Sequence, residues 1–110
     1  MANLDKYRIC VEDILKKYGS FPEEDGIESQ LIFDREHDHY QLNNVGWQDN
    51  TRICGPVLHF DIKNNKIWIQ HNGTEFDIAD ELIAMGVSRQ DIVIGFMPLY
   101  KRKYTGFAIE

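Results

Sequence analysis

The sequence predicts an α+β protein with the element order α-β-β-β-β-α-β: an N-terminal helix, a four-stranded antiparallel meander, a second helix and a C-terminal strand. Two segments repeat apolar residues every three or four positions, and the stretch between them holds successive extended runs separated by turn formers. Such an order favours helices that cover one face of an antiparallel sheet. The chain has 110 residues, so we expect residues 1–110 to form a single domain.

The first helix is expected over residues 3–20. Asn3 is its candidate cap, and Gly19 supplies a left-handed stop. Asp5 in the first turn, and Lys16 and Lys17 in the last, complement the helix dipole. Its expected apolar stripe consists of Leu4, Tyr7, Val11, Ile14, Leu15 and Tyr18.

The strands of the meander are bounded by recognisable turns. The tandem asparagines of the stretch KNNK, residues 63–66, tolerate the positive φ angles of a tight hairpin. Gly55 followed by Pro56 indicates a bulge or an edge position in the third strand. The four strands are expected over residues 27–35, 39–48, 51–63 and 66–71.

The second helix is expected within residues 73–87, where Thr74 and Asp77 imitate a capping box and Gly86 ends the helix. A short capped turn, SRQD, follows, and residues 92–96 are expected to form a final buried strand. The apolar stripe of this helix would consist of Ile78, Ala79, Leu82 and Met85.

Composition excludes some classes of function. The formal charge is 12 − 18 = −6, so the chain as a whole does not attract a phosphate backbone. No run approaches the roughly 18 apolar residues of a membrane span, and no apolar signal segment opens the chain. Cys10 and Cys54 are expected to be buried, reduced thiols rather than a disulfide. These features favour a cytoplasmic protein.

The stretch FDREHDHYQL, residues 33–42, concentrates carboxylates and imidazoles in a few positions. Consecutive residues of one turn rarely converge on a metal, so we interpret it as a solvated hairpin whose charges, including Asp34 and Glu36, protect a strand edge. The alternative is a two-histidine, one-carboxylate metal site. It would combine His59 and Asp61 with one of His37, His39 or His71.

The sequence contains no catalytic motif that would define a reaction. The serines lie in no nucleophile motif, and the glycines form no phosphate loop. We therefore predict a protein that is not an enzyme, with no catalytic residue, no cofactor and no metal ion.

The candidate binding residues lie mainly in the stretch YKRKY, residues 100–104. Its cations and rings can contact phosphate and bases, bind an acidic protein surface, or cover the protein's own apolar face. Trp68 is expected in the core, whereas for Trp47 core packing and an interface role are both open. The candidate binding residues are Tyr100, Lys101, Arg102, Lys103, Tyr104, Trp47, Asp34 and Glu36.

Several long segments resemble the XisI family, known as the fdxN element excision controlling factor XisI. They are ESQLIFDREHDHYQLNNVGW, GPVLHFDIKNNKIWIQHNGTE, IADELIAMGVSRQDIVIGF and YKRKYTGFAI, in that order along nearly the whole chain. The resemblance implies an α+β fold and a cyanobacterial role in the excision of a DNA element during heterocyst differentiation. It implies action beside a site-specific recombinase and a companion factor, XisH. It provides no catalytic residue to carry over.

Three functions follow as hypotheses. The favoured one is a non-enzymatic accessory factor that binds an XisH-like protein, with a homodimer expected through an exposed strand edge. The second is an accessory protein that contacts DNA through Lys101, Arg102 and Lys103, together with Arg52. The third is a metal-dependent hydrolase built on His59 and Asp61.

Overall fold

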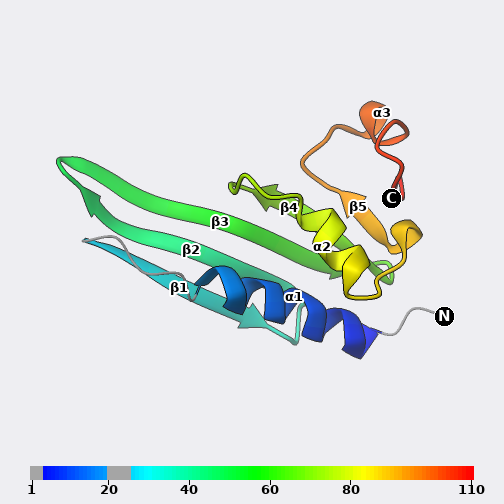
Figure 1. The fold of residues 1–110 in the computed structure, drawn as a ribbon, viewed down its shortest axis with the longest axis horizontal. Helices are drawn as coiled ribbons and strands as arrows, with labels where there is room; N and C mark the ends of the chain where they lie inside the picture. Colours follow the sequence, from blue (N-terminus) through cyan, green and yellow to red (C-terminus); the bar gives the residue numbers. More distant parts are fainter. Residues whose placement is uncertain (1–3, 20–25) are drawn as a thin grey trace.

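The computed structural model describes residues 4–19 and 26–110 and has the expected α+β architecture (Figure 1). Asn3, the expected helix cap, and residues 20–25 of the polar connection lie outside this part of the chain. The elements are α1 Leu4–Gly19, β1 Ile27–Asp34, β2 His39–Gln48, β3 Thr51–Lys63, β4 Lys66–Asn72, α2 Ile78–Ala84, the 3₁₀ turn η1 Arg89–Asp91, β5 Ile92–Ile94 and α3 Leu99–Arg102.

The five strands form one sheet in the order β1-β2-β3-β4-β5. The first four pair antiparallel, as the meander predicts, and β5 returns parallel to β4 after the α2 crossover. The last strand is shorter than the expected residues 92–96, because the chain turns out of the sheet after Ile94. Met97 N donates to Ile94 O over 3.1 Å and closes that turn.

The predicted turn and bulge are confirmed. Asn64 and Asn65 have φ angles of 55° and 62° in the β3–β4 hairpin. In the β2–β3 ladder, Leu42 pairs with Leu58 and Asn43 with Pro56, so an extra residue is inserted in β3 beside Pro56. The bulge reverses which side chains face each side of the sheet along the rest of β3.

Helices α1 and α2 cover one face of the sheet (Figure 1). The expected α1 stripe is confirmed, since all its members are buried except Leu4, which packs half-buried against the core. The α2 stripe contributes Ile78, Ala79 and Leu82 to the same core. The largest fully buried side chains are Tyr40, Phe60, Leu15, Leu42, Leu58, Ile67, Ile69, Ile78, Leu82 and Ile92, with Val11 and Val93.

The start of α2 differs from the expected capping box. The helix begins at Ile78, and its cap is Asp77, whose side chain accepts from Asp80 N over 3.2 Å. The hydroxyl of Thr74 instead donates to Asn72 Oδ1 over 2.6 Å. A local turn around Asn72 thus holds Thr74 outside the helix, and the first good cap after that turn is Asp77.

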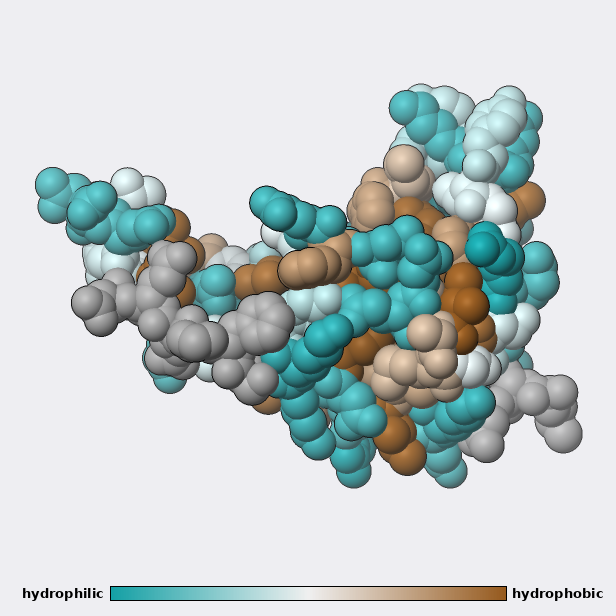
Figure 2. Space-filling model, viewed as in Figure 1, coloured by the Kyte–Doolittle hydropathy of each residue, from teal (hydrophilic) through white to brown (hydrophobic). Residues whose placement is uncertain are grey.

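The distal half of the β2–β3 hairpin, residues 43–56, projects from the core, and we call it the arm (Figures 1 and 2). None of its residues is buried, whereas Tyr40 and Phe60 in the same strands are 0% exposed. The molecule measures 46 × 29 × 25 Å, and its radius of gyration of 14.5 Å exceeds the roughly 13 Å of a compact domain of this size.

The two cysteines have different environments. Both are free thiols, as expected, and Cys10 is buried in α1. The expectation that Cys54 is buried was wrong, because it lies exposed on the arm, where no helix covers the sheet. Within the described part of the chain, no helix has the length and apolar character that a bilayer crossing requires.

Candidate functional site

A row of side chains crosses the sheet on the face opposite to α1 and α2, which we call the open face. Directly paired residues of neighbouring strands project from the same face, so the strand register defines the row. Its members alternate along each strand with core residues such as Tyr40, Phe60 and Ile69. From β1 to the C-terminal segment, the row consists of Asp34, His39, Asp61, Trp68, Val93 and Ala108.

The β4–β5 end of this row is a small second core. Trp68, Val93 and Ala108 are buried against one another, separately from the main core. The guanidinium of Arg102 lies 5.1 Å from the Trp68 ring centroid, and the ammonium of Lys63 lies 4.0 Å from it. The prediction that Trp68 is a core residue is confirmed.

Arg102 is engaged within the protein. Its Nε donates to Met97 O over 3.0 Å and its Nη1 donates to Ile109 O over 3.3 Å, while its planar group covers Trp68. These contacts hold the C-terminal segment against the open face. Arg102 therefore covers the protein's own apolar face, which was one of the three alternatives for the YKRKY stretch.

The other residues of YKRKY are exposed. The ammonium of Lys101 lies 5.8 Å from the ring centroid of Tyr100, and that of Lys103 lies 5.1 Å from the ring centroid of Tyr104. Exposed apolar side chains surround them, with Leu99 at 55% and Tyr104 at 78% exposure. We define the C-terminal patch as Phe96, Met97, Leu99, Tyr100, Lys101, Lys103 and Tyr104.

Trp47 lies near the tip of the arm, on the same face as the row. Its side chain is 54% exposed, and the guanidinium of Arg52 on the neighbouring strand lies 5.4 Å from its ring centroid. Trp47 and Arg52 are direct partners in the β2–β3 register. Trp47 is therefore not a core residue, and its interface role stays a prediction.

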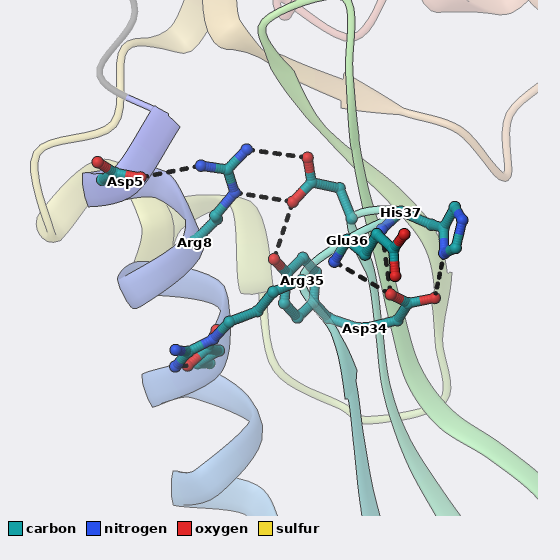
Figure 3. Close-up of polar contacts among 9 residues, drawn as sticks. Asp5, Arg8, Asp34, Arg35, Glu36 and His37 are labelled. Atoms are coloured by element: carbon teal, nitrogen blue, oxygen red, sulfur yellow. Dashed lines mark hydrogen bonds and ion pairs between the residues drawn. The ribbon is translucent and has the colours of Figure 1, made fainter.

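Asp34 builds the turn of the charged hairpin (Figure 3). Its Oδ1 accepts from the backbone N–H groups of Glu36 and His37 over 3.1 and 3.0 Å, and its Oδ2 lies 2.9 Å from His37 Nδ1. The hydrogen bond from the His37 backbone, followed by that from its ring, holds the pKa of Asp34 below its usual value. Glu36 is exposed to solvent at the same turn.

The same hairpin is attached to α1 by two ion pairs that are not expected from the sequence (Figure 3). The guanidinium of Arg8 binds both oxygens of Asp38 over 2.8 and 3.1 Å, and Arg35 binds both oxygens of Glu12 over 2.8 and 2.6 Å. The partners are 30 and 23 residues apart, so no local spacing marks them. The hairpin is therefore part of the folded body rather than a loose charged loop.

A cluster of two imidazoles and one carboxylate lies in the row between β2 and β3. His39 Nδ1 and His59 Nε2 both approach Asp61 Oδ1, over 2.8 and 2.9 Å. The amide of Gln70 donates to Asp61 Oδ2 over 3.1 Å. Burial raises the pKa of Asp61, but the hydrogen bonds from His39, His59 and Gln70 outweigh it and leave that pKa lowered.

The structure thus brings together one version of the sequence-based metal alternative. Among the described residues, the ligand atoms of His39, His59 and Asp61 lie within 4.8 Å of one another. His71 pairs with His59 in the β3–β4 register but is not a member of this group. His37 stacks on His39, with ring centroids 6.5 Å apart, and pairs with Asp34 instead.

The fold and its surfaces define a small α+β protein in which a five-stranded sheet, helix-covered on one face, carries a projecting arm. The sequence signature of the family described as XisI protein matches residues 1–109, and the chain belongs to this family. No protein with a curated description matches the sequence.

Two solved structures from Anabaena variabilis are similar to this chain. The crystal structure of a XisI-like protein has a TM-score of 0.93 and 47% sequence identity, covering 98% of this chain and 100% of the other. The crystal structure of fdxN element excision controlling factor XisI has a TM-score of 0.83 and 35% identity, covering 97% and 98%. The expected family and fold class are therefore confirmed.

Proposed function

We propose that this protein is a non-enzymatic accessory factor in the programmed excision of a DNA element. In this proposal it acts in the cytoplasm of a cyanobacterium during heterocyst differentiation and binds an XisH-like protein that works beside a site-specific recombinase. Membership of the XisI family supports the accessory role, as does the 35% identity to a solved excision controlling factor. The proposal that this protein binds a partner rests mainly on the arm and its exposed side chains.

The side chains of the arm add little to the hydrophobic core, because none of residues 43–56 is buried. It nevertheless presents Trp47, with 54% of its side chain exposed, beside Arg52. Tryptophan and arginine are the residues that most often dominate the binding energy of protein interfaces. An unpacked sheet extension with such a pair at its tip supports an anchor for a partner protein.

The C-terminal patch supplies a second contact surface. Leu99, Tyr100 and Tyr104 are exposed by 55%, 69% and 78%, and Lys101 and Lys103 lie beside the tyrosine rings. Clustered aromatic and apolar side chains of this kind are typical of interaction sites. The net charge of −6 would accelerate encounter with a basic, DNA-acting partner.

The experiment is co-elution with light scattering of the purified protein and the XisH-type protein from the same genome, at low and high salt. We expect a stable complex whose affinity falls with salt. The protein measured alone also tests the homodimer, which β1 supports because it is an edge strand with exposed Leu31 and Ile32. A mixture that elutes as two separate species at micromolar concentration contradicts the proposal.

Matched variants locate the interface. Trp47→Ala should weaken the complex at least about tenfold, the usual effect of removing an interface anchor. Phe76→Ala is its control, because Phe76 is 55% exposed and lies outside both surfaces. The double variant Lys101→Glu, Lys103→Glu tests the C-terminal patch. The double variant Lys16→Glu, Lys66→Glu is its control, because it makes the same change of charge outside the patch. Equal effects of the test and control pairs would remove these surfaces from the proposal.

DNA contact is the second candidate function, favoured by the exposed Lys101 and Lys103 beside tyrosine rings that can stack on bases. Arg102 is engaged within the protein, so two lysines would carry the contact. Binding to a duplex oligonucleotide should then weaken with salt, and the slope should decrease by about 2 in the doubly charge-reversed variant. A charge-reversed tail that still binds DNA equally would exclude this function.

A further inference from the structure

The three side chains of the His–Asp cluster converge from two neighbouring strands. His39 comes from β2, and His59 and Asp61 come from β3, two residues apart and therefore on the same face. Because His39 and Asp61 are direct register partners, the strand pairing itself places the two imidazoles on either side of one carboxylate. The geometry follows from the sheet, not from a flexible loop.

Both imidazoles point to the same oxygen, Asp61 Oδ1, at 2.8 and 2.9 Å. A tetrahedral metal with bonds of about 2.1 Å holds its ligand atoms about 3.4 Å apart. Side-chain movements of roughly half an ångström would therefore admit an ion among His39 Nδ1, His59 Nε2 and Asp61. The ion would replace the two hydrogen bonds, and each imidazole would carry its proton on the other ring nitrogen.

The surroundings of the cluster are those of a metal site. Gln70 holds the second oxygen of Asp61 over 3.1 Å, in the way that outer hydrogen bonds orient metal ligands. The side chains of Asp61, His59 and His39 are 15%, 27% and 55% exposed, so the carboxylate is shielded and one side remains open. Solvent can thus complete the coordination of an ion bound there.

We propose that His39, His59 and Asp61 form a binding site for one divalent first-row transition-metal ion, such as Zn²⁺ or Co²⁺. Imidazole nitrogens select these ions over Mg²⁺ and Ca²⁺, which prefer ligand sets made only of oxygen. The site lies on the open face, directly beside Trp68 in the register.

The test is titration of the tag-free, chelator-treated protein with Co²⁺ followed by visible absorption, and with Zn²⁺ followed by calorimetry. We expect one equivalent of either ion to bind with micromolar or tighter affinity and to raise the melting temperature. Excess Mg²⁺ should not compete. Failure of the wild-type protein to bind Co²⁺ and Zn²⁺ saturably would overturn the proposal.

Two ligand variants and one control make the test specific. His39→Gln and His59→Gln should each lower the affinity for Co²⁺ at least about tenfold. His71→Gln is the control, because His71 pairs with His59 across β3–β4 but is outside the cluster. Circular dichroism checks the fold, and His39 is exposed enough for its variant to remain folded. A loss of affinity in the His71 variant equal to that in the ligand variants would refute the assignment.

Discussion

Arg35 and Glu12 form a two-point ion pair that joins the charged hairpin to α1. Arg35 Nε lies 2.8 Å from Glu12 Oε2, and Arg35 Nη2 lies 2.6 Å from Glu12 Oε1. The two side chains differ greatly in exposure, with 70% for Arg35 and 4% for Glu12. Among the described residues, Glu12 is the one buried charged side chain. Its ionised carboxylate is costly to bury unless Arg35 pairs with it.

Removing Arg35 alone should destabilise the protein more than removing both members of this pair. Arg35→Met leaves the Glu12 carboxylate buried without its partner, and a buried polar group in that state costs about 1–3 kcal/mol. The double variant Arg35→Met, Glu12→Met should recover most of this loss. Urea unfolding of the two single variants and the double variant measures the coupling, and additive effects would contradict the pairing.

Replacing Gly46 should disrupt the pairing of β1 with the arm. A Cβ atom at Gly46 would lie 1.8 Å from the carbonyl oxygen of Gly26, which is backbone and cannot move aside cheaply. We expect Gly46→Ala to lower the free energy of unfolding by more than about 1 kcal/mol.

Gly55 provides the matched control on the neighbouring strand of the arm. A Cβ atom there meets nothing within 4 Å, so Gly55→Ala should leave stability nearly unchanged. Thermal melting of both variants, followed by circular dichroism, makes the comparison. If Gly46→Ala melts at the wild-type temperature, the described β1–β2 register is wrong.

Glu81 should contribute its full stabilisation only above the pH at which it titrates in the unfolded chain. Burial raises its pKa, but the hydrogen bonds from Lys17 and Tyr18 outweigh it and leave the pKa lowered in the fold. A lowered folded-state pKa stabilises the protein above the unfolded value of about 4.3, and this contribution is lost as the pH falls below it.

The stability difference between the wild-type protein and Glu81→Gln should therefore be constant near neutral pH and shrink towards pH 3. Melting temperatures measured from pH 7 to pH 3 provide the comparison, with the exposed Glu28→Gln as control. A difference that grows on acidification would reverse the assigned sign.

Arg102→Ala should loosen the C-terminal segment without unfolding the main core. The variant loses the bonds to Met97 O and Ile109 O and uncovers Trp68. Amide exchange at Ala108, whose N–H donates to Ile92 O over 2.9 Å, should become faster. Lys101→Ala should not change this exchange rate, since the ammonium of the exposed Lys101 lies beside the ring of Tyr100 and not against Trp68.

Local sequence signals determined the secondary structure closely. The asparagine pair at residues 64 and 65 indicated a tight turn because Asn tolerates positive φ angles, and Gly55 with Pro56 indicated a bulge or an edge position. Such signals depend on neighbours a few positions apart, which the chain itself specifies. The helix α2 starts later than the capping box predicted, because the local turn around Asn72 holds Thr74 outside the helix and Asp77 becomes the cap.

The sequence was a poorer guide to which side chains lie on the surface. The exposure of Trp47 and Cys54 depends on where the helices stop covering the sheet, and the inward role of Arg102 depends on Trp68, 34 positions earlier (102 − 68). Neither property follows from the residue type or from its immediate neighbours.

By itself, the sequence determined the fold class and the run of four antiparallel strands, because periodicity and turn chemistry are local, and its resemblance along nearly the whole chain indicated the family. Only the tertiary structure decided that His39 joins His59 and Asp61 while His71 does not. It also paired Glu12 with Arg35. The physical reason is that strand register and bulges decide which distant side chains share a face, and a shift of one residue would move each of them to the opposite side.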